Sequence, residues 1–291
     1  MNKLEAPHFR LTGKLTPEQV SFFDKYGILQ LKSFIDKETI LSFLEETKRV
    51  QHFLVEKGFR KINGIPLKFG KDLDGSTLIQ RIAFTSYYSK VFADFLKDDR
   101  LKELLTLLGR FEGRIGEHEK DGLVFNHYIN AEESNFRQLG WHTDSPRDLF
   151  LGSRILPMLN VGLHLDDCSF ESGGLRVIPG THKQNLFRLL FGKKYFIDNR
   201  TDDREVGFDI EAGDLTVHDG RLWHRVQRSS LKGAESRRRV LYFPIITGRF
   251  KPKNEYSPTP FYHKIGQMKW SGSLRPVWVE RKNQLRNNNS R

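Results

Sequence analysis

The chain has 291 residues, enough for a substantial core in one large domain or two smaller ones, and none of its apolar runs approaches the 18 residues of a membrane-spanning helix. Its net charge of +12 argues only weakly for a nucleic-acid ligand, because residues 248–291, with 10 Lys and Arg against 2 Asp and Glu, carry eight of those charges. The single cysteine, Cys168, excludes an internal disulfide and a cysteine-rich zinc module and favours a cytoplasmic setting, and the N-terminus lacks the apolar stretch of a signal peptide.

The first 110 residues predict helices interrupted by two strands. Thr16 followed by Pro17 is typical of a helix N-terminus, and Asp36 is a good N-cap for a second helix with a core-facing apolar stripe. The expected helices cover residues 16–25, 36–50, 90–96 and 101–108, and the expected strands cover 28–31 and 77–85.

From about residue 122 the pattern changes to short β-rich runs separated by Gly, Asp, Asn and Pro. Such spacing favours an antiparallel sandwich or barrel. The runs are residues 123–130, 157–165, 175–178, 214–217 and 238–246. Without a repeat or a low-complexity linker, one domain is the simpler prediction. The charged segment 193–205 is expected to be a mobile surface loop. The tail from residue 249 still holds Phe261, Tyr262, Trp270 and Trp278, which predicts that part of it packs back on the domain.

A candidate metal motif lies in Trp141-His142-Thr143-Asp144. In an extended segment residues two apart point to the same side, so His142 and Asp144 could hold two neighbouring positions on a divalent metal. A third ligand from far along the chain would complete the two-histidine, one-carboxylate set of non-haem Fe(II) oxygenases. A second His-x-Asp pair, His164 and Asp166, leaves the choice of pair open at this level.

Three blocks of the sequence resemble the phytanoyl-CoA dioxygenase family of Fe(II)- and 2-oxoglutarate-dependent oxygenases. They occur in the family's order, and the similarity covers about residues 12–247, which leaves 248–291 as a basic C-terminal extension. The blocks are Trp141-His142-Thr143-Asp144, then residues 171–183 with Gly174-Leu175-Arg176-Val177-Ile178-Pro179-Gly180, then residues 212–224 followed by 237–243. The resemblance implies a mainly β fold, a double-stranded β-helix or jelly roll, with flanking helices.

The resemblance also implies which residues bind iron. His142 and Asp144 match the metal pair and His224 matches the distal ligand, whereas His164 is expected in the core and His182 and His218 are expected to be structural. The implied cofactors are Fe(II), 2-oxoglutarate and O2, with succinate and CO2 as coproducts of the hydroxylation of a small molecule. Related halogenases lack the carboxylate, so the presence of Asp144 favours hydroxylation.

For the far carboxylate of 2-oxoglutarate, a guanidinium offers two matched hydrogen bonds. The candidates are Arg237, Arg238 and Arg239, and the alignment with the family selects Arg238, which would share a strand face with Val240. Asn126 falls where some relatives place an amide that contacts the cosubstrate. Many relatives carry a serine two residues after the distal histidine. Here that residue is Val226, which leaves the replacing donor open.

The substrate, its oxidised position and the oligomeric state are not indicated by the sequence. Arg147, Trp223, Arg225 and residues 193–205 are expected near the mouth of the site, and both an acyl-CoA and a small anionic metabolite are compatible substrates. Two other functions remain open. One is a non-catalytic β-sandwich that binds its ligand through the basic tail, and the other is a cupin-type metalloenzyme that uses no 2-oxoglutarate.

Overall fold

The computed structural model describes residues 2–5, 7–146, 149 and 154–260. Its helices are α1 (Pro17–Tyr26), α2 (Lys37–Glu56), α3 (Lys90–Phe95), α4 (Asp99–Glu103) and α6 (Leu186–Phe191), with short 3-10 turns at Thr85–Tyr88, Leu104–Leu108, Thr181–Lys183 and Gly233–Ser236. The strands are β1 (Asn2–Lys3), β2 (Ile28–Leu31), β3 (Lys61–Ile62), β4 (Ile65–Pro66), β5 (Lys68–Lys71), β6 (Thr77–Ile82), β7 (Gly113–Ile115), β8 (Val124–Tyr128), β9 (Leu139–His142), β10 (Met158–His164), β11 (Gly174–Val177), β12 (Val206–Gly207), β13 (Leu215–Asp219), β14 (His224–Gln227) and β15 (Arg238–Thr247).

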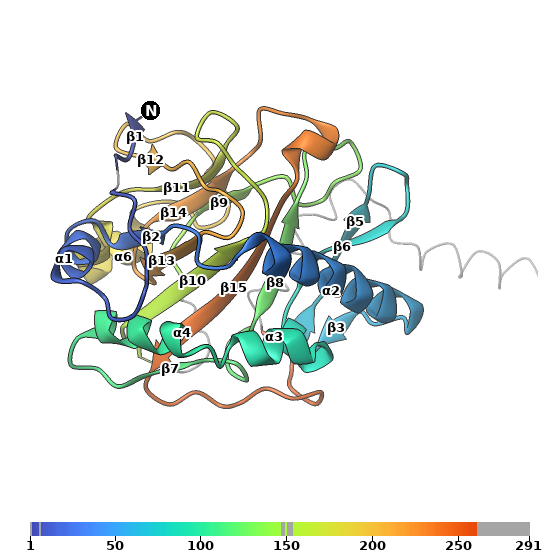
Figure 1. Cartoon of the computed structure of the whole chain (residues 1–291), viewed down its shortest axis with the longest axis horizontal. Coiled ribbons are helices and arrows are strands. Elements are labelled where there is room, and N and C mark those ends of the chain that lie inside the picture. Colours follow the sequence, from blue (N-terminus) through green and yellow to red (C-terminus); the bar gives the residue numbers. More distant parts are fainter. Residues whose placement is uncertain (1, 6, 147–148, 150–153, 261–291) are drawn as a thin grey trace, which may run out of the picture.

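Two sheets form the body of the protein, and all their strand pairs are antiparallel except the parallel pair β1–β12 (Figure 1). The larger sheet has the order β2-β13-β10-β15-β8-β6-β5, with β7 paired to β15, and the smaller has the order β1-β12-β11-β14-β9. Between β8 and β15 the chain passes back and forth between the two sheets, so β10 pairs with β13 and β15, whereas β9 pairs with β14. This interleaving is that of a jelly roll, which confirms the predicted fold class.

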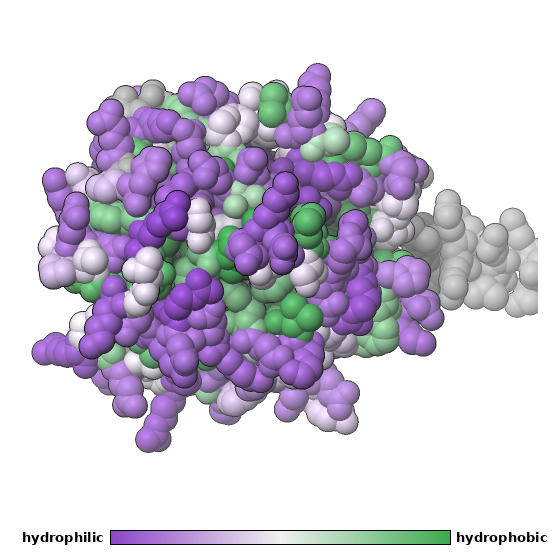
Figure 2. Space-filling model, viewed as in Figure 1, coloured by the Kyte–Doolittle hydropathy of each residue, from purple (hydrophilic) through white to green (hydrophobic). Residues whose placement is uncertain are grey.

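The helices cover the outer face of the larger sheet, where α2, α3 and α4 lie across its strands (Figure 1). Alternate residues of each strand point to this side, among them Val161 and Phe243, and they pack against Phe43 and Val50 of α2 in the main hydrophobic core. The outward side of the helices is largely hydrophilic, and hydrophobic side chains form only small separate areas on this face (Figure 2). The helices therefore close one side of the sheet and leave its other face to the space between the sheets.

The predicted elements of the first half are present, with two changes, one of which is that the strand expected at residues 77–85 ends at Ile82 and is followed by the 3-10 turn at Thr85–Tyr88. Thr16 caps α1 and receives a hydrogen bond from the Gln19 amide, and Asp36 caps α2 through the Thr39 amide. The expected helix at residues 101–108 is instead α4 followed by a 3-10 turn at Leu104–Leu108. Consecutive leucines predict burial equally well in either form, so the sequence pattern does not separate them.

Residues 248–260 run back along the domain. Gly248 accepts a hydrogen bond from Arg114, and the Lys253 amide donates to the His118 carbonyl at 2.7 Å. The aromatic residues of the tail that were expected to pack back, from Phe261 onward, lie outside the described residues, as does Arg147. The division into a domain at 12–247 and an extension at 248–291 therefore remains a prediction. Within the described part of the chain, no helix combines the length and apolar character needed to cross a membrane.

Candidate metal centre

The space between the two sheets is polar on the side of the larger sheet. The strand faces opposite the helix-covered core carry side chains such as Asn126, Asn160, His164, His218 and Arg238, all of which are mostly buried. A polar interior inside an otherwise apolar fold is costly unless the groups find partners. This face therefore has the character of a binding site.

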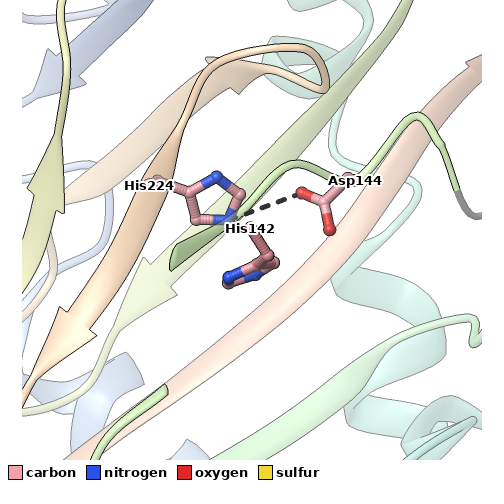
Figure 3. A group of neighbouring side chains, drawn as sticks. All are labelled: His142, Asp144 and His224. Carbon is pink, nitrogen blue, oxygen red and sulfur yellow. Dashed lines mark ion pairs between the residues drawn. The ribbon is translucent and has the colours of Figure 1, made fainter. Parts of the chain in front are cut away.

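Three side chains meet at one end of this space (Figure 3). The ligand atoms of His142, Asp144 and His224 all lie within 4.8 Å of one another, and all three residues are buried. His142 is the last residue of β9, Asp144 follows it, and His224 begins β14 and pairs with His142 across the two strands. Strand pairing thus joins residues more than 80 positions apart, and the three residues that the sequence singled out lie together.

Both histidines present the same nitrogen to the centre. Nδ1 of His142 lies 2.8 Å from the Gly140 carbonyl, and Nδ1 of His224 lies 3.0 Å from the Leu222 carbonyl. A carbonyl only accepts, so Nδ1 carries the hydrogen and the lone pair of Nε2 is available. Burial lowers the pKa of His224 well below its usual value, and the neighbouring His142 acts in the same direction. The neutral imidazoles and the carboxylate form a suitable donor set for a divalent metal.

Two residues of the larger sheet face Asp144. The Asn160 amide donates to its Oδ2 at 2.9 Å, and Nε2 of His218 lies 3.5 Å from the same oxygen. Asn160 and His218 are direct neighbours across β10 and β13, so a single paired position of the sheet places both side chains beside Asp144. The sequence interpretation left Asn160 out and assigned His218 a structural role. Only the strand register, which the sequence pattern does not contain, brings them to the site.

The second His-x-Asp pair lies apart from this centre. Nε2 of His164 contacts the Thr216 hydroxyl at 3.0 Å, and Asp166 forms an ion pair with Arg239. Burial lowers the pKa of His164 to about 4, so its ring is neutral. Among the described residues, His142, Asp144 and His224 are the one group of three or more that could hold a metal ion.

The three consecutive arginines have different partners. Arg237 pairs with Asp72 and Arg239 pairs with Asp166, whereas Arg238 pairs with no described carboxylate. Arg238 is only 9% exposed and reaches from β15 across the intersheet space to the Gln227 carbonyl of β14, at 2.8 Å. A buried guanidinium without an acid is costly unless an anion binds to it.

Several buried polar atoms of this interior have no hydrogen-bond partner among the described residues. They are Asn126 Oδ1, the Tyr128 hydroxyl, Arg238 Nε and both ring nitrogens of His218. Buried groups are normally satisfied, so such a cluster suggests a ligand that takes part in the bonding. Val226, where relatives have serine, packs with Tyr128 and Val240 in a small hydrophobic cluster. It offers this ligand an apolar contact in place of a hydroxyl.

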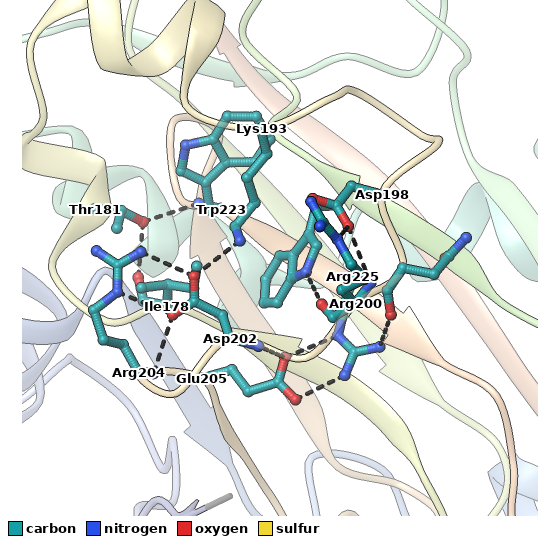
Figure 4. Close-up of polar contacts among 12 residues, drawn as sticks. Ile178, Thr181, Lys193, Asp198, Arg200, Asp202, Arg204, Glu205, Trp223 and Arg225 are labelled. Atoms are coloured by element: carbon teal, nitrogen blue, oxygen red, sulfur yellow. Dashed lines mark hydrogen bonds and ion pairs between the residues drawn. The ribbon is translucent and has the colours of Figure 1, made fainter.

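Two residues expected near the mouth have other positions. Trp223 is buried against Trp141 and Ile178, and its amide donates to the Thr181 hydroxyl. Arg225 lies on the outer face of the smaller sheet and forms a buried ion pair with Glu205 (Figure 4). Residues 193–205 form an irregular segment on that face, and most of them are exposed, as expected of a surface loop, whereas Glu205 is fully buried. Within the segment, Lys193 and Asp202 form a mostly buried ion pair, whereas the side chains of Arg200 and Arg204 are exposed.

Comparisons with known proteins agree with this geometry. The sequence model of the phytanoyl-CoA dioxygenase family matches residues 23–230. A curated relative from Stutzerimonas stutzeri, named "Probable alpha-ketoglutarate-dependent hypophosphite dioxygenase", is 22% identical over 170 residues, which is 58% of this chain. The match spans about half, 54%, of that relative's length.

Solved structures share the fold. HygX from Streptomyces hygroscopicus, determined with nickel and 2-oxoglutarate bound, has a TM-score of 0.56 and 20% identity, and the match covers 82% of this chain and 89% of HygX. The non-haem alpha-ketoglutarate-dependent carbocyclase SnoK from nogalamycin biosynthesis has a TM-score of 0.58 and 17% identity, with coverage of 90% and 92%. At these identities the likeness concerns the fold alone.

Proposed function

The chain belongs to the phytanoyl-CoA dioxygenase family, and on that premise we propose that it is an Fe(II)- and 2-oxoglutarate-dependent dioxygenase that hydroxylates a small molecule. The observation that carries this proposal is the pair of features in one intersheet space, a buried two-histidine, one-carboxylate cluster and an arginine that has no acidic partner among the described residues. The first suits ferrous iron, and the second suits the far carboxylate of the cosubstrate. Neither feature alone would distinguish this enzyme class from a structural metal site or a simple anion site.

The residues would divide the work as follows. His142, Asp144 and His224 would hold the iron, with Asn160 fixing the carboxylate of Asp144 through its 2.9 Å hydrogen bond. Iron held there would supply, together with 2-oxoglutarate and O2, a two-electron oxidant, with succinate and CO2 as coproducts. Arg238 would bind the far carboxylate of 2-oxoglutarate by its guanidinium.

Tyr128 is the donor that we propose in place of the missing serine, and Asn126 is a second proposed contact of the cosubstrate, through its side-chain amide. Both lie on β8, on the strand face that also carries the orphaned atoms, and both have a buried polar atom that needs a partner. Tyr128 also lies beneath Arg238, with 5.7 Å between the guanidinium carbon and the ring centre. Its hydroxyl can donate to an anion without adding a charge.

The nature of the oxidation is part of the proposal. Asp144 supports hydroxylation over halogenation, because a ligating carboxylate occupies the position that a halide would take. The same fold also occurs in enzymes named for reactions other than hydroxylation, since SnoK is named a carbocyclase. A small-molecule substrate, including an anionic one, remains a prediction, as does a cytoplasmic location.

Spectroscopy of the anaerobic protein tests the proposal. Addition of Fe(II) and then 2-oxoglutarate should produce a visible charge-transfer band at one iron per chain, and oxygen should then release succinate slowly. A protein that retains no iron and binds ligands with a steep salt dependence would instead support the binding-protein alternative. Iron retention with no response to 2-oxoglutarate would favour a cupin-type enzyme. A metabolite library screened for faster succinate release would then identify the substrate.

A further inference from the structure

Residues 193–205 form a fixed strap along the edge of the metal site. β9 is the last strand of the smaller sheet, and its free edge binds the strap backbone. The Phe196 amide donates to the Trp141 carbonyl at 2.9 Å, and the Trp141 amide donates to the Asp198 carbonyl at 2.8 Å. These two bonds extend the sheet beside His142.

Buried charges hold the rest of the strap (Figure 4). Arg225 and Glu205 form a bidentate pair, with distances of 2.9 and 2.7 Å, and both side chains are almost fully buried. Lys193 forms an ion pair with Asp202 at 2.9 Å, where each side chain is 13% exposed. Charge-assisted hydrogen bonds of this kind are strong and directional when both partners are shielded from water and well aligned. The strap therefore has a defined conformation.

The strap brings Phe196 against a proposed iron ligand. The Phe196 ring stacks on the His142 ring, with centroids 4.8 Å apart and planes at 30°. Its neighbour Tyr195 shares a hydrogen bond of 2.7 Å with the hydroxyl of Thr143, the residue between His142 and Asp144. Two adjacent aromatic residues thus contact both sides of the short segment that carries two of the three ligands.

The backbone at Phe196 is strained. Its φ of 60° lies in the left-handed region, which is rare for a bulky residue and costs free energy. The close approach of the strap backbone to β9 also requires glycine at position 140, because a Cβ there would lie 2.8 Å from the Phe196 carbonyl carbon. Glycine at position 196 would adopt this backbone conformation without strain. The residue present is instead a phenylalanine that is 46% exposed. Burial in the hydrophobic core does not account for a phenylalanine here, since nearly half of the residue is exposed to solvent. The contact of its ring with His142 does account for it.

We infer that Phe196 is a positioning residue that fixes the His142 ring in its metal-binding orientation and separates the site from solvent. The inference rests on the proposed function. The His142 ring is held at Nδ1 by the Gly140 carbonyl and contacts the rings of His224 and Phe196. Removal of the phenylalanine would take away the stacking contact and leave the Gly140 hydrogen bond to hold the imidazole, which would let the ring tilt more readily out of the position in which its Nε2 faces the other ligands.

Phe196→Gly tests the inference without endangering the fold, because glycine suits the left-handed backbone. Nickel binding, measured by calorimetry on the full chain without iron, should weaken by about tenfold, in the range found for groups that orient metal ligands. The melting temperature of the metal-free protein should stay unchanged or rise. Phe196→Tyr keeps the ring and should restore the wild-type affinity.

Ile197→Gly is the matched control. Ile197 is the next residue of the strap and is 53% exposed, so its substitution loosens the same backbone without removing the ring. It should leave nickel affinity within about twofold of wild type. Equal nickel affinity of wild type and Phe196→Gly would overturn this inference but not the proposed function. Equal loss of nickel affinity in both glycine variants would have the same meaning. Failure of the wild-type protein to bind nickel would overturn the proposed function and the inference with it.

Discussion

His142 and His224 occupy facing positions of the β9–β14 pair, and their ring centres lie 4.0 Å apart. The two imidazoles are held by the same device, a hydrogen bond from Nδ1 to the carbonyl two residues earlier. Because both rings are oriented before any metal arrives, little side-chain entropy remains to be lost on binding.

Replacement of a proposed ligand should abolish iron retention. His142→Ala and His224→Ala each remove one of three donors, and we expect Fe(II) affinity to fall by more than about 100-fold, beyond the effect of outer residues. His164→Ala is the control, since His164 binds Thr216 and lies outside the cluster. Metal content after anaerobic loading and desalting measures the effect. Loss of iron in the His164 variant alone would show that the wrong His-x-Asp pair has been assigned.

Arg238→Ala should weaken 2-oxoglutarate binding. Loss of a charge-assisted hydrogen bond in a buried site costs about 2 kcal/mol, or roughly 30-fold in Kd. Arg239→Ala removes a neighbouring arginine whose partner is Asp166, so it should leave cosubstrate affinity near the wild-type value. Titration of the charge-transfer band gives both constants. If the Arg239 variant lost affinity and the Arg238 variant did not, the cosubstrate would bind elsewhere.

Glu205→Ala should destabilise the protein strongly. It leaves the Arg225 guanidinium buried without its acid, and breaking such a pair costs about 3–5 kcal/mol. Arg204→Ala removes an ion pair whose arginine side chain is 69% exposed, and the cost there should stay below about 1 kcal/mol. Urea unfolding of the two variants provides the comparison. Similar midpoints would show that the strap contributes little to stability.

Stability should fall as the pH is lowered below 6.5, in part because of His127. Burial lowers the pKa of His127 to about 3, and the nearby Arg237 acts in the same direction. Arg237 donates to the ring at 3.1 Å, which requires the neutral form. Because the unfolded chain binds the proton first, the stabilisation is complete above pH 6.5 and is lost progressively toward pH 3.

The variant His127→Gln isolates this contribution. Between pH 7 and pH 5 the wild type should lose about 2 kcal/mol more than the variant, from the 1.36 kcal/mol that each pKa unit represents. Both proteins keep Asp72, whose pKa is lowered mainly by its hydrogen bonds with Arg237 and only to a small extent by His127, so most of the contribution of that carboxylate cancels in the difference. Parallel pH profiles of the two proteins would contradict the assignment.

The β-rich runs predicted a sandwich or barrel, and the resemblance of three motifs to a known family predicted the jelly roll and selected His142, Asp144 and His224 as the candidate ligands. Helix caps and alternating strands are local signals, and the capped helices α1 and α2 appeared where those signals lay. The strands that carry the metal cluster did not stand out as β-rich runs. β9 and β14 are four residues long and rich in polar or glycine residues, so pairing rather than propensity makes them strands.

What the sequence determined by itself is which chemical groups the protein has and which of them recur in a family pattern. Tertiary structure alone decided that Asn160 and His218 face Asp144, that Arg238 rather than its two neighbours lacks an acid among the described residues, and that a charged segment is tied to the smaller sheet by the buried pair of Glu205 and Arg225. Each of these outcomes depends on contacts between residues far apart along the chain. Their free energy is set by strand register and burial, which no local window of sequence contains.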